Sequence, residues 1–233
     1  MCIRDRHYSA TAAVAAKFSM PLVGVMGDID VARVNQNIIK AKHYGAKLKT
    51  VPGTLKEAIT DAIKTWTTNP DYAYVCGSVV SSSPFPKIVA FAQSIIGREI
   101  REQSISQEGK LPDMIVGCVG GGSNFAGAIY EFLDEPSVTK IGVEAHETAA
   151  LTNGTPGIMQ GMKTYMLQSD DGAKSLGGMS LGAGITYFSV GPLHSYLKDQ
   201  GAVQYSSATD KEMLEAYKIC LLYTSPSPRD SIA

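Results

Sequence analysis

The segment that most constrains the fold is an apolar run that ends in three consecutive glycines and leads into a helix-like pattern. Residues 114–127 read MIVGCVGGGSNFAG, which predicts a buried strand, a glycine turn and the start of a helix. Glycines have no Cβ, so backbone N–H groups can close around an anion, and the helix N-terminus adds partial positive charge. Ser123 and Asn124 can cap that helix or donate hydrogen bonds to a phosphate. The segment predicts a phosphate-binding loop, with a purely structural tight turn as the alternative.

Two common nucleotide-binding motifs do not fit this loop well. The dinucleotide fingerprint needs Gly or Ala where this chain has Phe125, although Glu144 ends the next apolar strand at a plausible distance for the ribose-binding acid. A Walker A loop needs Gly-Lys-Ser/Thr, which does not follow the glycines. The loop therefore predicts a phosphate ligand and makes a dinucleotide a minor alternative.

Strand-like and helix-like segments alternate along most of the chain. We expect strands at 20–26, 47–51, 72–76, 113–119 and 140–145, and helices at 8–19, 31–44, after Thr54, and at 86–109, 124–134, 192–199 and 210–219. Strands that are apolar throughout and alternate with helices indicate α/β architecture with doubly wound, mostly parallel sheets. Between His146 and Gly184 the pattern dissolves into Gly, Thr, Ser and Asp, which predicts a functional or mobile loop region.

Composition excludes some functions and favours others. The formal charge of −1 at pH 7 offers no electrostatic reason to expect a nucleic acid or an anionic membrane as a partner. No apolar run approaches the ~20 residues that span a bilayer. The 4 cysteines show no metal-binding spacing and fit reduced thiols in a cytoplasmic protein.

The two ends of the chain break the surrounding patterns. Residues 1–6 (MCIRDR) and 221–233 (LLYTSPSPRDSIA) resemble translated sequencing-adapter sequence. We therefore interpret both as non-native tails and expect the gene to be truncated.

Five segments in order carry a resemblance to a known family. They are DVARVNQNI (30–38), GSVVSSSPFPKIV (77–89), GCVGGGSN (117–124), KTYMLQSDDG (163–172) and FSVGPLHSYLKDQGAVQYSSATDKE (188–212). Together they resemble the β subunit of tryptophan synthase, a pyridoxal-phosphate (PLP) enzyme of fold-type II, over about residues 7–220. The resemblance implies a small mobile domain at 7–77, which closes over the amino-acid substrate, and an incomplete PLP-binding domain at 78–220.

The resemblance also implies the residues of the site. Those that bind PLP would be Gly77, Ser78, Gly120, Gly121, Gly122, Ser123 and Asn124. Those that bind the substrate would be His7, Arg33 and Thr186, and the carbonyls of Gly120, Tyr187 and Ser189 would bind a monovalent cation, Na⁺ or K⁺. His194 is interpreted as a packed or capping residue, not as a catalyst.

The implied reaction is replacement of the L-serine hydroxyl by indole to give L-tryptophan. The implied assembly is a homodimer, with a tryptophan synthase α subunit as a further partner. In the family, the Schiff-base lysine and the acid/base glutamate precede the residue matched by His7, and the partner of the pyridine nitrogen follows residue 220. We therefore expect this chain to lack all three groups and to be inactive as a fragment.

Two departures from the family pattern concern specificity. Thr186 stands where the family commonly has an Asp that pairs with the residue matched by Arg33, and Met159-Gln160 replaces the aromatic pair of the indole tunnel. The alternatives are another fold-type II lyase, such as a serine dehydratase or a sulfhydrylase, and a non-catalytic α/β module that binds a different phosphate ligand.

Overall fold

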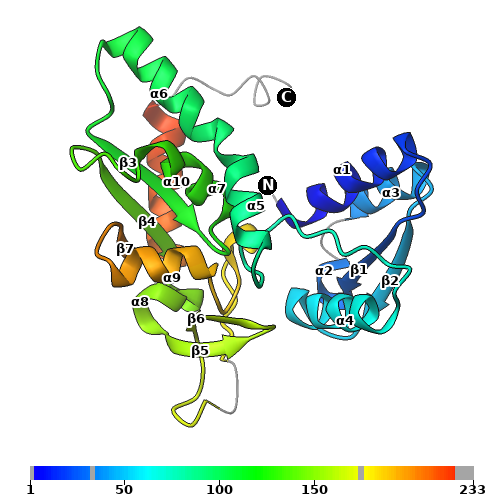
Figure 1. Ribbon diagram of the computed structural model, residues 1–233. Coiled ribbons are helices and arrows are strands. Elements are labelled where there is room, and N and C mark those ends of the chain that lie inside the picture. The colour runs from blue at the N-terminus through cyan, green and yellow to red at the C-terminus, as the bar shows by residue number, and fades with distance from the viewer. Residues whose placement is uncertain (1–2, 32–34, 173–175, 224–233) are drawn as a thin grey trace. The chain divides into compact units, whose positions relative to one another are not determined.

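The computed structural model describes residues 3–31, 35–172 and 176–223. The chain divides into two compact units, Met1–Gly77 and Ser78–Ala233 (Figure 1). That the first unit is mobile and the second binds a cofactor remains a prediction.

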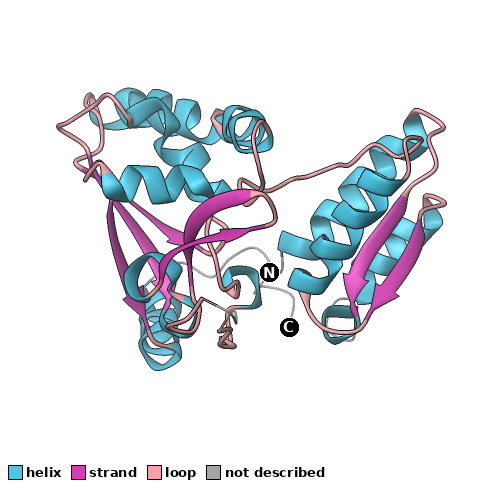
Figure 2. Ribbon diagram, turned by 60° about the horizontal axis from the view of Figure 1, so that its bottom comes forward, coloured by secondary structure: helices cyan, strands magenta, loops and turns pink. Residues whose placement is uncertain are grey.

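The first unit is built on two parallel strands, β1 (Val23–Gly27) and β2 (Lys47–Val51). Figure 2 shows these strands between helices. The helices are α1 (Ile3–Lys17), α2 (Asp28–Val31), α3 (Asn35–His43) and α4 (Leu55–Thr68). α1 packs against α3, and α4 packs against β1. The small buried core of this unit consists of Tyr8, Ala12, Ala41 and Ala46.

The second unit contains a three-stranded parallel sheet with the strand order β3-β4-β7. The strands are β3 (Met114–Val119), β4 (Thr139–Ala145) and β7 (Gln204–Ala208), and an antiparallel pair is formed by β5 (Thr155–Met159) and β6 (Met162–Met166). The helices are α5 (Phe85–Gln93), α6 (Ile95–Glu108), α7 (Ser123–Ile129), α8 (Ala150–Asn153), α9 (Pro192–Asp199) and α10 (Asp210–Tyr223), with 3₁₀ turns at Tyr130–Phe132, His146–Thr148 and Ala183–Ile185. The core includes Phe125, Ile129, Phe132, Leu151 and Val190, all fully buried. This α/β architecture with mostly parallel sheets confirms the predicted fold class.

Helix caps form where the sequence predicts them. The backbone N–H and hydroxyl of Thr54 both donate to the carboxylate of Glu57, at 2.8 and 2.9 Å. Thr209 makes the same pair of bonds to Glu212, both at 2.8 Å. Gly45 ends α3 with a φ of +81°, a conformation that glycine adopts without strain.

Two predicted elements differ from the structure. The helix expected at 86–109 is two helices, because Ser94 ends α5 and begins α6, and its hydroxyl donates to the Phe91 carbonyl at 2.8 Å. The strand expected at 72–76 is absent, and these residues pair with no strand in the described part of the chain. An apolar run becomes a strand only where a neighbouring strand satisfies its backbone groups.

The region between His146 and Gly184 is more ordered than predicted. β5 and β6 form a hairpin in which Met159 pairs with Met162. The two residues between them, Gln160 and Gly161, have φ values of +47° and +79°. Two successive positive φ angles are the requirement of a type I′ turn, which matches the twist of a hairpin. The prediction of a loop was therefore wrong over these strands.

Among the described residues, no helix is both long enough and apolar enough to cross a membrane.

Candidate functional site

The glycine loop connects the carboxyl end of β3 to the start of α7, where open parallel sheets bind ligands. Each glycine lies against another segment. A Cβ on Gly120 would lie 2.7 Å from the Cα of Ile185, and a Cβ on Gly121 would lie 2.8 Å from Val80. Gly122 has a φ of +95°, and its Cβ would lie 2.2 Å from the His194 ring. No larger side chain fits these three positions without movement of a neighbour.

The loop presents backbone donors that have no partner in the part of the chain that the structure describes. Among the described residues, no acceptor pairs with the backbone N–H of Gly121, Gly122, Ser123 or Asn124. The first N–H groups of a helix have no intrahelical acceptor, so an external anion can satisfy them. This arrangement fits a phosphate group in the cradle.

Two serine hydroxyls border the loop. Ser123 Oγ accepts a hydrogen bond from the N–H of Val79 at 3.0 Å. Ser78 Oγ accepts one from the N–H of Val80 at 3.0 Å and would lie 3.2 Å from a Cβ on Gly121. Because Ser123 Oγ acts as acceptor toward Val79, its own proton is available to donate to an anion.

The opposite side of the loop is held by α9 and β7. The N–H of Gly191 donates to the Gly121 carbonyl at 3.0 Å. His194 Nε2 lies 2.8 Å from the Gly122 carbonyl oxygen, and Nδ1 lies 2.9 Å from the Tyr205 hydroxyl. Burial lowers the pKa of His194 to about 4, and burial together with the nearby Glu144 carboxylate raises the pKa of Tyr205. His194 is a buried packing residue, as predicted, and it also contacts the loop.

Glu144, the acid of the dinucleotide alternative, has a different role. Its carboxylate accepts hydrogen bonds from the N–H groups of Leu151 and Thr152, both at 2.9 Å, and from the Thr152 hydroxyl at 2.8 Å. Burial raises the pKa of Glu144, and these hydrogen bonds act in the opposite direction. The carboxylate is occupied in binding the start of α8, so the structure argues against a ribose-binding role.

Three of the other predicted residues, His7, Gly77 and Arg33, belong to the first unit. His7 lies against Gly77, where an added Cβ would lie 2.7 Å from His7 Nδ1, and desolvation by the surrounding atoms lowers the pKa of His7. Arg33 lies outside the described residues.

The remaining predicted residues lie in the second unit, near the loop. Tyr187 and Ser189 are buried and directly follow the Gly184–Ile185 segment that contacts Gly120. The Thr186 hydroxyl donates to the Gly182 carbonyl at 3.0 Å.

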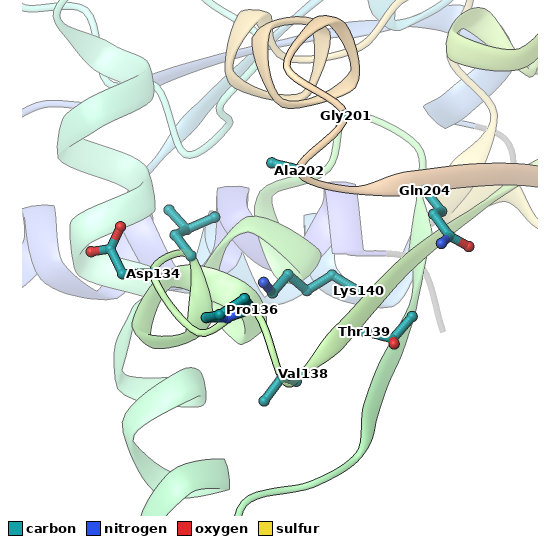
Figure 3. Close-up of a pocket in the computed structure, with 9 residues that line it drawn as sticks. Asp134, Pro136, Val138, Thr139, Lys140, Gly201, Ala202 and Gln204 are labelled. Atoms are coloured by element: carbon teal, nitrogen blue, oxygen red, sulfur yellow. The ribbon is translucent and has the colours of Figure 1, made fainter.

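A separate hollow of about 500 Å³ lies at the amino ends of β4 and β7 (Figure 3). Its lining residues are Leu133, Asp134, Pro136, Val138, Thr139, Lys140, Gly201, Ala202 and Gln204. In Figure 3 the buried Lys140 side chain extends toward Pro136, and its ammonium donates to the Glu135 carbonyl at 2.9 Å. This lysine therefore stabilises the turn before β4, and the hollow contains none of the loop residues.

The described residues contain no group of three or more His, Cys, Asp or Glu side chains that could hold a metal ion.

A glycine loop at the end of a parallel strand, with N–H groups that have no acceptor among the described residues, is typical of phosphate-binding α/β domains. Comparison with known proteins identifies the protein family. Residues 7–222 match the sequence profile of the family described as pyridoxal-phosphate dependent enzyme. The chain belongs to this family.

Curated relatives share the match over nearly the whole chain. The tryptophan synthase beta chain of Ruegeria pomeroyi is 45% identical over 228 residues, and that of Allorhizobium ampelinum is 43% identical over 226 residues. Both matches cover 92% of this chain and 55% of the relative, so the chain spans about half the length of these relatives.

Solved structures share the fold. A threonine deaminase from T.th. has a TM-score of 0.65 at 18% identity, covering 92% of this chain and 62% of the other. An O-acetyl serine sulfhydrylase isoform 3 from Entamoeba histolytica has a TM-score of 0.62 at 17% identity, covering 93% and 55%. The predicted fold-type II architecture of PLP enzymes is confirmed.

Proposed function

We propose that this chain is part of a tryptophan synthase β-type enzyme, which replaces the hydroxyl of L-serine with indole to form L-tryptophan. The single observation that carries the cofactor half of this proposal is the set of N–H groups in the glycine loop that find no acceptor among the described residues. The substrate half is supported by relatives of 43–45% identity that are named tryptophan synthase beta chain.

The residues of the loop would hold the phosphate of PLP. The N–H groups from Gly121 to Asn124 and the Ser123 hydroxyl would donate to its oxygens. Gly77 and Ser78 would border the rest of the cofactor. When bound, PLP supplies an electron sink for bond changes at the amino acid. The protein contributes binding, orientation and polarisation around it.

We further propose a monovalent cation site beside the loop. The carbonyls of Gly120, Tyr187 and Ser189 are hard oxygen ligands suited to Na⁺ or K⁺. The contact of Gly120 with Gly184 and Ile185 supports this, because Tyr187 and Ser189 follow that segment closely.

The substrate residues and the Schiff-base lysine remain proposals. His7 would contact the substrate carboxylate, and closure of the first unit would involve Arg33 and Thr186. No lysine or glutamate between residues 7 and 220 is assigned to the Schiff base or to acid/base catalysis, so the chain alone would not turn over. The proposed assembly is a cytoplasmic homodimer that binds an α subunit.

A binding measurement tests the cofactor half. We expect 4′-deoxypyridoxine 5′-phosphate, which cannot react with surface lysines, to bind the chain in a calorimetric titration. Gly121→Asp should abolish binding, because it places a side chain and a negative charge in the cradle. Gly177→Asp is the matched control, since a Cβ there would meet no described atom within 4 Å apart from its own residue and its chain neighbours. Equal affinity in wild type and Gly121→Asp would contradict the assignment of the loop.

A chimaera tests the substrate half. The matched stretch of this chain would replace its counterpart in the Ruegeria pomeroyi β chain, and the product would be assayed with PLP, L-serine and indole. We expect tryptophan. Pyruvate alone would favour a dehydratase, cysteine from O-acetylserine and sulfide would favour a sulfhydrylase, and failure to retain PLP would favour a module for another phosphate ligand.

A further inference from the structure

We propose that His194 is a positioning residue for the phosphate-binding loop, in the tautomer that the Gly122 carbonyl requires and the Tyr205 hydroxyl satisfies. This inference rests on the proposed function of the loop. His194 would act through the Gly122 carbonyl and would not touch the cofactor.

The planar peptide units of the loop determine where its N–H groups point. In a trans peptide the carbonyl of one residue and the N–H of the next point in opposite directions. From the α9 side of the loop, Gly191 binds the Gly121 carbonyl and His194 binds the Gly122 carbonyl, which also accepts the Ala126 N–H of α7 at 2.8 Å. The N–H groups of Gly122 and Ser123 must therefore point away from α9. These are two of the donors that have no acceptor among the described residues.

The two hydrogen-bond partners of His194 determine which of its ring nitrogens carries the proton. A carbonyl oxygen can only accept, so the 2.8 Å contact with the Gly122 carbonyl requires a proton on His194 Nε2. In a neutral imidazole, Nδ1 is then an acceptor, and the Tyr205 hydroxyl at 2.9 Å must be its donor. The Gly122 carbonyl thus selects the Nε2–H tautomer of His194, and the Tyr205 hydroxyl, which can donate or accept, satisfies Nδ1.

The His194 ring is packed too tightly to turn. His194 is 0% exposed. Phe125 stacks on the ring with 5.9 Å between centroids and 12° between planes, and Tyr205 meets it edge-on at 86°. The backbone of Gly122 approaches so closely that a Cβ there would lie 2.2 Å from Nε2. The His194 donor is therefore held on the carbonyl.

Three substitutions separate this role from a merely structural one. In His194→Gln the side-chain amide can place a donor near the position of Nε2, whereas His194→Leu removes the donor. In His194→Asn the shorter side-chain amide reaches the position of Nδ1, beside Tyr205, but not that of Nε2, so a polar group remains while the Gly122 carbonyl loses its donor. Tyr165→Phe is the matched control, because the Tyr165 hydroxyl bonds to Asp199 at 2.9 Å away from the loop.

The test combines nitrogen NMR of the histidines with titration of 4′-deoxypyridoxine 5′-phosphate into the full chain. We expect the Nε2–H signature for His194 in wild type and in Tyr165→Phe. Affinity for the probe should fall about tenfold in His194→Leu and His194→Asn, the effect of roughly one misdirected hydrogen bond. It should recover in His194→Gln, and the amide resonances of Gly122 and Ser123 should shift in parallel with affinity.

The outcomes distinguish the two proposals. Failure of the wild-type chain to bind the probe would overturn the proposed function. Normal binding by wild type with unchanged affinity in both His194→Leu and His194→Asn would overturn the positioning role alone. His194→Asn keeps the test decisive if His194→Leu does not fold. An Nδ1–H signature for His194 in the wild-type chain would also contradict the proposed role.

Discussion

The hydroxyl oxygen of Ser123 accepts the backbone N–H of Val79 at 3.0 Å, and this bond joins the glycine loop to the segment that begins the second unit. Val79 is fully buried, so its N–H has no access to water if the bond is lost. The same hydroxyl is among the proposed phosphate donors. One side chain thus contributes both to folding of the loop and to its ligand.

Removal of this hydroxyl should therefore affect stability and binding together. We expect Ser123→Ala to lower the free energy of unfolding by about 1–3 kcal/mol, the cost of an unsatisfied buried donor. Ser123→Thr, which keeps the hydroxyl, should restore most of the loss. Urea denaturation and titration of 4′-deoxypyridoxine 5′-phosphate measure the two effects. An Ala variant as stable as the Thr variant would show that the Val79 N–H finds another acceptor.

Position 122 requires glycine for two reasons, its backbone conformation and its closeness to His194. Gly122→Ala should lower the free energy of unfolding by roughly 1–2 kcal/mol because of its positive φ, and it must also displace the His194 ring. Gly201 has a φ of +64°, and an added Cβ would meet no described atom within 4 Å beyond its own residue and chain neighbours, so Gly201→Ala carries the backbone cost alone. We expect Gly122→Ala to be clearly the less stable of the two in thermal unfolding. Equal destabilisation would mean that the ring moves aside freely.

The buried imidazole should make stability depend on pH. The pKa of His194 is lowered from 6.5 to about 4, so the unfolded chain binds a proton in this interval that the folded chain excludes. The free energy of unfolding is therefore unaffected by this group above pH 6.5. It falls as the pH is lowered from 6.5 toward 4, by roughly 3 kcal/mol in all.

The His194→Gln variant isolates this contribution, because the other titrating groups are unchanged. The difference in unfolding free energy between wild type and His194→Gln, measured by urea denaturation from about pH 7.5 to about pH 4, should shift in favour of the variant as pH falls. A pH-independent difference would show that His194 is not kept neutral.

Glu144 should contribute through the donors it satisfies. We expect Glu144→Ala to destabilise the second unit by about 1–3 kcal/mol or more, because the N–H groups of Leu151 and Thr152 lose a buried acceptor. Glu144→Gln keeps one acceptor oxygen and should lose less. Chemical denaturation ranks the three proteins, and hydrogen exchange at Leu151 should accelerate in the order wild type, Gln, Ala. Unchanged exchange in the Ala variant would contradict this role.

Some features of this protein are determined by residues close together in the chain. The bonds between Thr54 and Glu57 and between Thr209 and Glu212 span three residues, and the sequence alone predicts them. The alternation of apolar strands and helices predicts the α/β fold, and three glycines between a strand and a helix predict the loop. Each of these follows from local backbone geometry and the spacing of apolar side chains.

Other features depend on contacts that only the folded chain creates. The turn at Gln160-Gly161 becomes a hairpin because its flanking strands pair, and residues 72–76 do not become a strand because no described strand pairs with them. His194 meets Gly122 across 72 residues of sequence. The sequence shows a histidine that packs in a helix, whereas the tertiary structure decides that its ring holds a carbonyl of the glycine loop. Hydrogen bonds between distant segments have no periodic signature, since each partner is chosen by how the elements pack.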